Sequence, residues 1–466
     1  MSLLNSSAEI IPAPIEGRHV DTGQFDWRNA LVVGAFAFPI LLIVNEPLTA
    51  LGISWFVFLF ALFIIRLGKT IPIMELMLLI AGLQWIVGAR TGYILNDDHW
   101  RYHMYVPEFE YMSLVVPGTI AFSLGVLLMI PKHDFDQVHN DLRLYSMSKP
   151  KVAYTMIIVG LVAEIYSPYK PASIGFLIYL IIGFKYVGLA LMLFSTNSKM
   201  KRVWLVIILG ILALNSIYLG MFHDLVLWGA LISCFLFLER QYSVRAKILI
   251  IGLGLFLMVV LQSAKGEFRE GRSDLNNQQK IERFFSVIAK RLIYFEDIAQ
   301  SGMVDLINVR FNQGWIISAI MENVPESEPY AKGETFIEAL ENAIVPRLFN
   351  QDKKLAGGQE NFRRLTGLTI GDGTSMGTSI IGEAYGNFGR GGAIFFMFFW
   401  GGLIAWVFGK LLKYASKSPL SLVFIPLVFF QVIKAETELY VVLNHFLKSL
   451  FFVGFFLWFA RKILGW

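Results

Sequence analysis

Basic side chains recur through one long polar segment of the chain, and their type and spacing suit the binding of an anion. Lys265 and Arg269 are one helical turn apart, so both project from the same face of a helix as it ends. The other members of the set are Arg310, Arg347, Arg363 and Arg364. Arginine holds phosphate through a planar fork of donors that stays charged at any working pH. The set therefore predicts an anion site, although each residue alone also fits snorkelling towards lipid headgroups.

The same part of the chain holds candidates for proton transfer. Glu383 lies among small and apolar residues, where an ionisable group is costly unless it is used. Its neighbours Gly382 and Gly386 have the spacing of a close contact between helices. A carboxylate or histidine beside a reacting hydroxyl can accept its proton. We rank Glu383 first for this role, followed by Glu360 and His445.

Other constellations are less specific. The glycine-rich segment 371–392 lacks both the lysine of a phosphate-binding loop and the spacing of a dinucleotide fingerprint. Asp97 and Asp98 precede two histidines, but their spacing fits no metal motif, so we expect a wet loop and assign no metal site. Glu164 and Lys185 lie inside apolar runs, where they either mark a functional site or pair with each other.

Membrane-spanning helices must position these residues. Of the 466 residues, 56% are hydrophobic and only 16% are charged, whereas a soluble domain is about a quarter charged. Apolar runs predict about twelve spans, at 29–45, 47–65, 71–95, 112–130, 152–168, 173–194, 203–221, 224–239, 248–264, 391–409, 418–434 and 443–460. The expected fold is an all-α integral membrane protein with one large, partly helical external loop. Basic residues are scattered among short loops, so we expect no nucleic-acid partner.

Lys and Arg residues in the short connections predict the orientation of the spans. One set of tails and loops carries 19 of them, and the opposite short loops carry 3, which are Arg101, Lys170 and Lys434. Both termini are therefore expected in the cytoplasm. The resulting divisions are a tail at 1–27, nine spans in 28–264, an external segment at 265–390 and three spans in 391–466.

Short helices are expected within the external segment. Thr335 and Glu338 have the spacing of a capping box. The apolar stripe predicted to follow consists of Phe336, Leu340 and Ile344. Residues 280–298 also have the pattern of an amphipathic helix. A loop of this length with ordered elements is usually functional.

Several pieces of the chain resemble the oligosaccharide repeat-unit polymerases of the Wzy type, within the broad O-antigen polymerase and ligase group. The pieces are QSAKGEFRE at 262–270, VRFNQGW at 309–315, KGETF at 332–336, VPRLF at 345–349 and GTSIIGEAYGNFG at 377–389. Their order, after many spans and before the last ones, matches that group.

The resemblance implies a membrane glycosyltransferase at the outer face of the bacterial inner membrane. Such an enzyme moves a growing glycan from one polyprenyl diphosphate to the repeat unit on another, without a metal or other cofactor. Its expected partners are the lipid-linked oligosaccharide, the bilayer, a flippase and a chain-length regulator. Carried onto this chain, the catalytic set is Glu383, Arg269 and Arg310. The diphosphate- and glycan-binding set is Lys265, Arg347, Arg363, Arg364, Glu360 and His445.

Three rival functions stay open at this point. A ligase of the same group would transfer the glycan to a different acceptor. A metal-dependent transferase that uses a polyprenyl-phosphate sugar would depend on Asp97 and Asp98. A flippase for lipid-linked sugars, which is not an enzyme, would need cations deep in many spans, whereas the predicted helices hold only Lys185 and Lys448.

Overall fold

A computed structural model describes residues 26–95, 99–130, 135–240, 242–269, 275–293, 311–344, 359–371, 374 and 376–466. These residues form helices and no named strand. Within them, nine helical stretches are long and apolar enough to cross a membrane. The chain is therefore an all-α, multi-pass membrane protein.

The nine stretches are built from α2 (Pro47–Arg66), α3 (Ile73–Gly82) with α4 (Gly88–Leu95), α5 (Glu108–Met129), α7 (Pro150–Tyr166), α8 (Gly175–Ile182) with α9 (Phe184–Leu193), α10 (Ser198–Leu219), α12 (Val244–Arg269), α19 (Ile380–Ala415) and α21 (Leu439–Lys462). The other three predicted spans coincide with shorter helices, α1 (Asp26–Leu41), α11 (His223–Glu239) and α20 (Leu420–Phe429). Each predicted span thus contains a helix, while the count of twelve spans stays a prediction.

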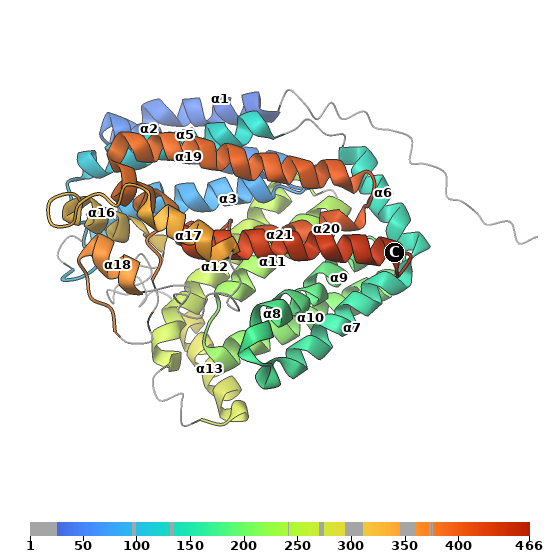
Figure 1. Ribbon diagram of the computed structural model, residues 1–466. Helices are drawn as coiled ribbons and strands as arrows, with labels where there is room; N and C mark the ends of the chain where they lie inside the picture. Colours follow the sequence, from blue (N-terminus) through green and yellow to red (C-terminus); the bar gives the residue numbers. More distant parts are fainter. Residues whose placement is uncertain are drawn as a thin grey trace, which may run out of the picture.

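Glycines allow α5 and α19 to pack closely against each other. The two helices run side by side (Figure 1). A Cβ atom at Gly125 of α5 would collide with the carbonyl oxygen of Phe398, and one at Gly401 of α19 would collide with that of Phe122. Small residues let helix backbones approach closely, which is how membrane helices gain packing energy.

Helix α19 begins well before the predicted span at 391–409. It starts at Ile380 and is interrupted at Gly389, whose φ of 67° is favourable only for glycine. The ring of Tyr330 packs against this glycine. The last part of the predicted external segment is therefore helical and continuous with a span, which places Glu383 in the first turn of α19.

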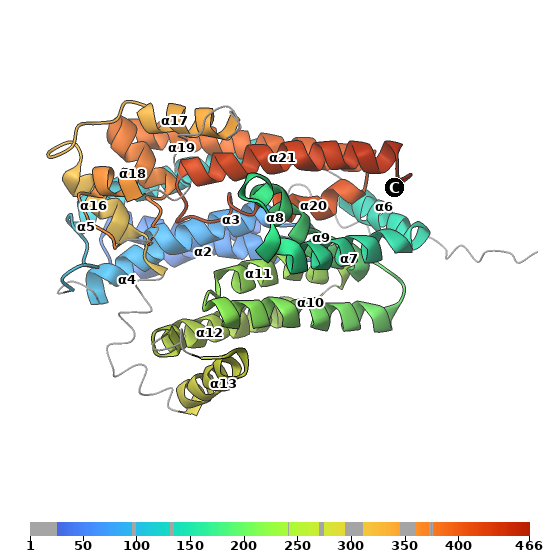
Figure 2. The ribbon, with the colours of Figure 1, turned by 60° about the horizontal axis from the view of Figure 1, so that its bottom comes forward.

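The segment predicted to be external contains, before α19, the described helices α13 (Asn277–Ile293), α16 (Gly314–Asn323), α17 (Glu334–Ile344) and α18 (Gln359–Thr366). The helix predicted at 280–298 is confirmed as far as Ile293, where the description of that stretch ends. Helices α16 and α18 lie at one end of the bundle and the C-terminus lies at the opposite end (Figures 1 and 2). We call the end with α16 and α18 the loop end.

The helix predicted to follow Thr335 is confirmed as α17, but the predicted cap is wrong. The helix begins at Glu334, so Thr335 lies inside it and is not its cap. The buried face consists of Thr335, Ala339 and Ala343, whereas Leu340 and Ile344 of the predicted stripe are exposed. The physical reason is that small side chains let α17 pack closely along α21. The larger apolar residues then face outwards.

Candidate functional site

Five ionisable side chains from three parts of the chain meet at the loop end. His223 and Asp224 begin α11, Lys265 lies in the last turns of α12, and Lys434 and Glu436 lie between α20 and α21. We call these five residues the charged cluster.

One loose ion pair and one histidine–carboxylate contact join α11 to the segment before α21. His223 Nδ1 lies 3.6 Å from Glu436 Oε1, and Lys434 Nζ lies 3.9 Å from Asp224 Oδ1. The positive charge of Lys265 also acts on His223. Both distances exceed that of a hydrogen bond. The cluster therefore brings opposite charges together without locking them into one arrangement.

Lys434 is held at the edge of the aromatic interior. Its side chain is 11% exposed, and its ammonium group lies 4.5 Å from the centre of the Phe430 ring. Burial lowers the pKa of Lys434, an effect opposed by the charges of Asp224 and Glu436. A partly desolvated ammonium group of this kind binds an anion more strongly than one in open water.

Side chains of other elements hold the backbone of the connection that carries Lys434 and Glu436. The carbonyl oxygen of Ala435 accepts hydrogen bonds from Ser379 Oγ at 2.6 Å and from Trp85 Nε1 at 3.3 Å. Ser379 has φ 62° and ψ 145°, a conformation that L-residues rarely adopt. Such strain persists only where the surroundings enforce it, and it clusters at functional sites.

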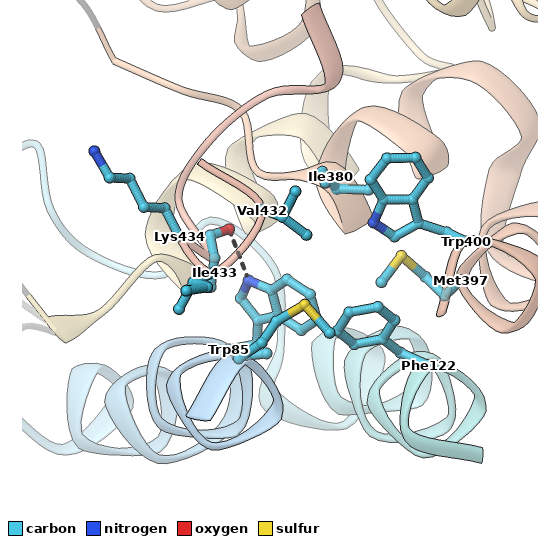
Figure 3. Close-up of a pocket in the computed structure, with 11 residues that line it drawn as sticks. Trp85, Phe122, Ile380, Met397, Trp400, Val432, Ile433 and Lys434 are labelled. Atoms are coloured by element: carbon cyan, nitrogen blue, oxygen red, sulfur yellow. Dashed lines mark hydrogen bonds between the residues drawn. The ribbon is translucent and has the colours of Figure 1, made fainter. Parts of the chain in front are cut away.

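A small apolar cavity of about 10 Å³ lies behind this connection. Figure 3 shows that Trp85, Trp400 and Met397 line it, while the ammonium group of Lys434 points away from it. The cavity is barely large enough for one water molecule. The cavity is part of the apolar packing behind the connection, and the ammonium group of Lys434 lies on the opposite side of that connection.

Arg269, placed in the catalytic set from the sequence, lies next to the charged cluster on α12. Its Nε donates to the carbonyl oxygen of Gly220 at 3.0 Å. Gly220 ends α10 in the left-handed conformation, with φ 64°. A cation at a helix C-terminus satisfies an orphan carbonyl and the negative end of the helix dipole. Arg269 therefore joins α12 to α10 through one edge of its guanidinium group.

Glu383 is buried, and each of its two carboxylate oxygens accepts a hydrogen bond. Its Oε1 accepts a hydrogen bond from Thr335 Oγ1 at 2.7 Å, and its Oε2 accepts one from the backbone N–H of Leu439 at 2.8 Å. Asn387 donates to Thr335 Oγ1 at 2.8 Å and extends this network. The carboxyl group, with a residue exposure of 2%, connects α17, α19 and the start of α21. Its predicted role in proton transfer stays a prediction, whereas its role in connecting these helices is visible.

The arginines of α18 differ in their partners. Arg364 is bound to Glu328 at 2.6 Å and to Glu334 at 3.0 Å, and its hydrogen bonds to these acids raise its pKa. Arg363 donates to Gln359 Oε1 at 3.0 Å and to the carbonyl oxygen of Ile370 at 3.1 Å. Two acids therefore already neutralise Arg364, whereas the partners of Arg363 are uncharged.

The remaining predicted residues are scattered. Glu360 is exposed on α18. His445 of α21 is 3% exposed, lies beside the rings of Phe176, Tyr179 and Phe430, and forms no hydrogen bond with the described residues. Arg310, Arg347, Asp97 and Asp98 lie outside the described residues. Within the described part of the chain, no three His, Cys, Asp or Glu side chains form a group able to hold a metal ion.

The sequence reading missed several residues that pair across the fold. His223 and Asp224 were not singled out, although two polar residues directly before an apolar run are a visible signal. Arg90 was also missed, and it bonds to Glu108 Oε2 at 3.0 Å and to Asn45 Oδ1 at 2.9 Å. These contacts join α4, α5 and the turn after α1.

One open question about the membrane interior is answered. Lys185 of α9 binds Glu164 of α7, and Asn215 of α10 donates to the same carboxylate oxygen at 2.8 Å. The pairing alternative is therefore confirmed. A charge pair that also receives a neutral hydrogen bond is the usual way to bury ionisable groups.

The sequence pieces that carry the resemblance pack against one another near the loop end. Gln313 Nε2 donates to the carbonyl oxygen of Gly377 at 2.9 Å, and the N–H of Lys332 donates to the carbonyl oxygen of Asn387 at 3.0 Å. A Cβ at Gly377 would collide with the carbonyl oxygen of Glu436. Residues 311–315, 332–336 and 377–389 thus form one structural unit, and it supports the connection that carries the charged cluster.

The apolar helices and the charged cluster at the loop end define a multi-pass membrane protein with a charged site at one end of its helix bundle. The family model for O-antigen polysaccharide polymerase Wzy matches residues 150–464, more than half of the chain. The chain belongs to this family, which confirms the resemblance and makes it a polymerase-type enzyme of polysaccharide biosynthesis that acts on a lipid-linked oligosaccharide. The comparisons with curated proteins and with solved structures gave no match.

Proposed function

We propose that this protein polymerises polyprenyl-diphosphate-linked oligosaccharide repeat units into a surface polysaccharide, such as an O-antigen, exopolysaccharide or capsule. The reaction would take place at the outer face of the inner membrane, with both termini in the cytoplasm. Family membership supports the reaction class. The observation that carries the site assignment is the charged cluster, which gathers Lys265 and Lys434 at the ends of spanning helices.

The proposed reaction exchanges one bond at an anomeric carbon for another. The hydroxyl oxygen of the acceptor sugar forms a bond to the anomeric carbon of the donor glycan, whose bond to the diphosphate oxygen breaks. The polyprenyl diphosphate leaves with the electron pair of that bond. Cations fixed near the departing oxygen lower the barrier, because they stabilise the charge that develops there. We assign this role to Lys434, Lys265 and Arg269, which lie near one another at the ends of α12 and of the segment before α21.

The acceptor hydroxyl must also lose a proton. We propose Glu436 as the acceptor of this proton, assisted by His223. The side chain of Glu436 is 31% exposed, and its partner His223 is 3.6 Å away. Glu383 would act as a positioning residue, because both of its oxygens are already bonded. Arg363 remains a candidate for glycan or diphosphate contacts, together with Arg310 and Arg347.

The test is the lipid-linked glycan profile of a strain that lacks this protein. Single repeat units accumulating on the carrier would support a polymerase, and long chains retained on the carrier would show a ligase instead.

Metal dependence has a separate test. In purified form the enzyme should polymerise in excess EDTA. Activity that is lost to EDTA and restored by magnesium would move the site to Asp97 and Asp98.

Orientation has its own test. Cysteines placed at Ser327 and Gln359, in the segment assigned outside the cytoplasm, should react with a membrane-impermeant thiol reagent in cells whose outer barrier is permeabilised. Labelling only after the inner membrane is broken would place this segment in the cytoplasm and overturn the proposed topology.

A further inference from the structure

Helix α17 carries three separate rows of side chains, each at the spacing that places residues one above another on a helix. The buried row consists of the small residues Thr335, Ala339 and Ala343. The exposed apolar row consists of Ile337, Leu340 and Ile344. The acidic row consists of Glu334, Glu338 and Glu341. Successive residues point about 100° apart, so each row covers about a third of the circumference.

Two contacts place the first turn of α17 beside spanning helices. The hydroxyl of Thr335 and the N–H of Leu439, the first residue of α21, donate to the two oxygens of the same carboxyl group, that of Glu383. The centre of the Phe336 ring lies 4.5 Å from that of Phe396 in α19, within the predicted span at 391–409. From there α17 packs along α21 (Figure 2). It therefore lies at the level of the loop-end turns of two spanning helices.

The exposed apolar row of α17 continues a surface that faces lipid. Phe395 and Phe399 of α19 are 67% and 54% exposed, and they belong to the same predicted span as Phe396. Phe336 packs against α19 and lies one helical turn before Leu340. The apolar row thus begins directly beside the lipid-facing side of α19.

The acidic row points in a different direction. The carboxylate of Glu334 pairs with Arg364 of α18 at 3.0 Å, and α18 lies at the loop end (Figure 1). A helix surrounded by water would not keep its large aliphatic side chains together in one exposed row, because apolar surface in water is unfavourable. Separate apolar and charged faces are typical of a helix at a membrane surface.

We propose that α17 is seated in the border of the bilayer at the loop end, with its apolar row among lipid acyl chains and its acidic row turned towards water. The partner of the apolar row is therefore lipid, although α17 is too short to span. Contact with lipid holds α17 against α21 and supports the bonds that join Thr335 and Leu439 to Glu383. This placement does not depend on the proposed reaction.

Spin labels on α17 test the placement. Cys234, the single cysteine of the chain, is replaced by alanine. A nitroxide label is then attached to Leu340→Cys or Ile344→Cys of the apolar row, or to Glu341→Cys of the acidic row as the matched control. All three positions are exposed, so the labels leave the buried row of α17 in place. The full-length protein is reconstituted in vesicles of phosphatidylethanolamine and phosphatidylglycerol.

Depth is measured from collisions of each label with oxygen, which concentrates among acyl chains, and with a nickel chelate, which stays in water. We expect labels at positions 340 and 344 to lie about 5–10 Å below the lipid headgroups and the label at position 341 to meet the nickel chelate. Nickel contact at 340 and 344 equal to that at 341 would mean that the row faces water and would overturn the inference. Labels at 340 and 344 that neither reagent reaches would mean that protein covers the row, and they would overturn it as well.

Discussion

Two acid-containing sites near the loop end differ in how completely their groups are paired. Glu383 has hydrogen-bond donors 2.7 and 2.8 Å from its two oxygens and is almost completely buried. In the charged cluster, Glu436 and Lys434 meet their partners only at 3.6 and 3.9 Å, and their surroundings are partly open.

This difference in pairing distinguishes a charge that stabilises the fold from a charge that is available to a substrate. A buried carboxylate that accepts a hydrogen bond at each oxygen stabilises the helices it joins, and its burial keeps it away from solvent and ligands. Charged groups that are close but not bonded can turn towards a ligand at little cost. The sequence alone ranks Glu383 highest, because an ionisable side chain among apolar residues costs free energy. Its bonding shows that the cost is offset by hydrogen bonds within the fold.

The largest effect is expected from Lys434→Gln. Removal of a partly desolvated cation from the leaving group should lower polymerisation by about 10²–10³-fold, the scale for losing one fixed electrostatic contact in the transition state. The measurement is polymer formed per amount of protein in the complemented strain. The matched control is Lys170→Gln, which changes another lysine of the predicted external loops; among the described residues, this lysine bonds to Ser167. Equal polymer from both variants would remove Lys434 from the site.

Glu383→Ala should act on folding first. It leaves the hydroxyl of Thr335 and the N–H of Leu439 without their acceptor, at about 1–3 kcal/mol for each buried donor. We expect less protein in the membrane and a lower midpoint of thermal unfolding in detergent, with activity per folded molecule much less affected. Glu341→Ala, an exposed acid on the same α17, is the control. A stable but inactive Glu383→Ala protein would restore Glu383 as a catalytic residue.

Arg269→Lys should have an intermediate effect. Lysine keeps the charge but cannot donate to Gly220 while presenting a second pair of donors to a diphosphate. We expect about a tenfold loss of polymerisation, which is about 1.4 kcal/mol. Arg283 also donates to a carbonyl oxygen, that of Glu267, at 2.8 Å, so Arg283→Lys controls for the loss of a structural contact. Similar losses in both variants would show that Arg269 acts only by joining helices.

The smallest effect is expected from Arg364→Lys. Glu328 and Glu334 already pair with this arginine at a partly exposed position, where such pairs contribute about 1 kcal/mol or less. Because its pKa is raised further above any working pH, its charge should not change between pH 5 and pH 9. Polymer length should match the unaltered protein across that range. A large loss would show that Arg364 leaves its acids to bind substrate.

Hydrophobic patterning by itself determined much of this protein. Each predicted span contains a helix, because a bilayer requires long apolar runs whose backbone groups bond internally. The same logic makes Glu164 and Lys185 pair, since an isolated charge inside the membrane is too costly. The family pieces also carried enough information to indicate a polymerase of the Wzy type.

Only the tertiary structure decided which charged residues have room to act. Asp224 and Lys434 are far apart in the sequence, and the packing of α11 beside the connection before α21 brings them together. The roles of Arg269 and Arg364 also diverge, because their neighbours come from other helices. Residue type and local spacing describe what a side chain can do. Its partners depend on long-range packing, and they determine whether its charge is satisfied within the fold or available to a substrate.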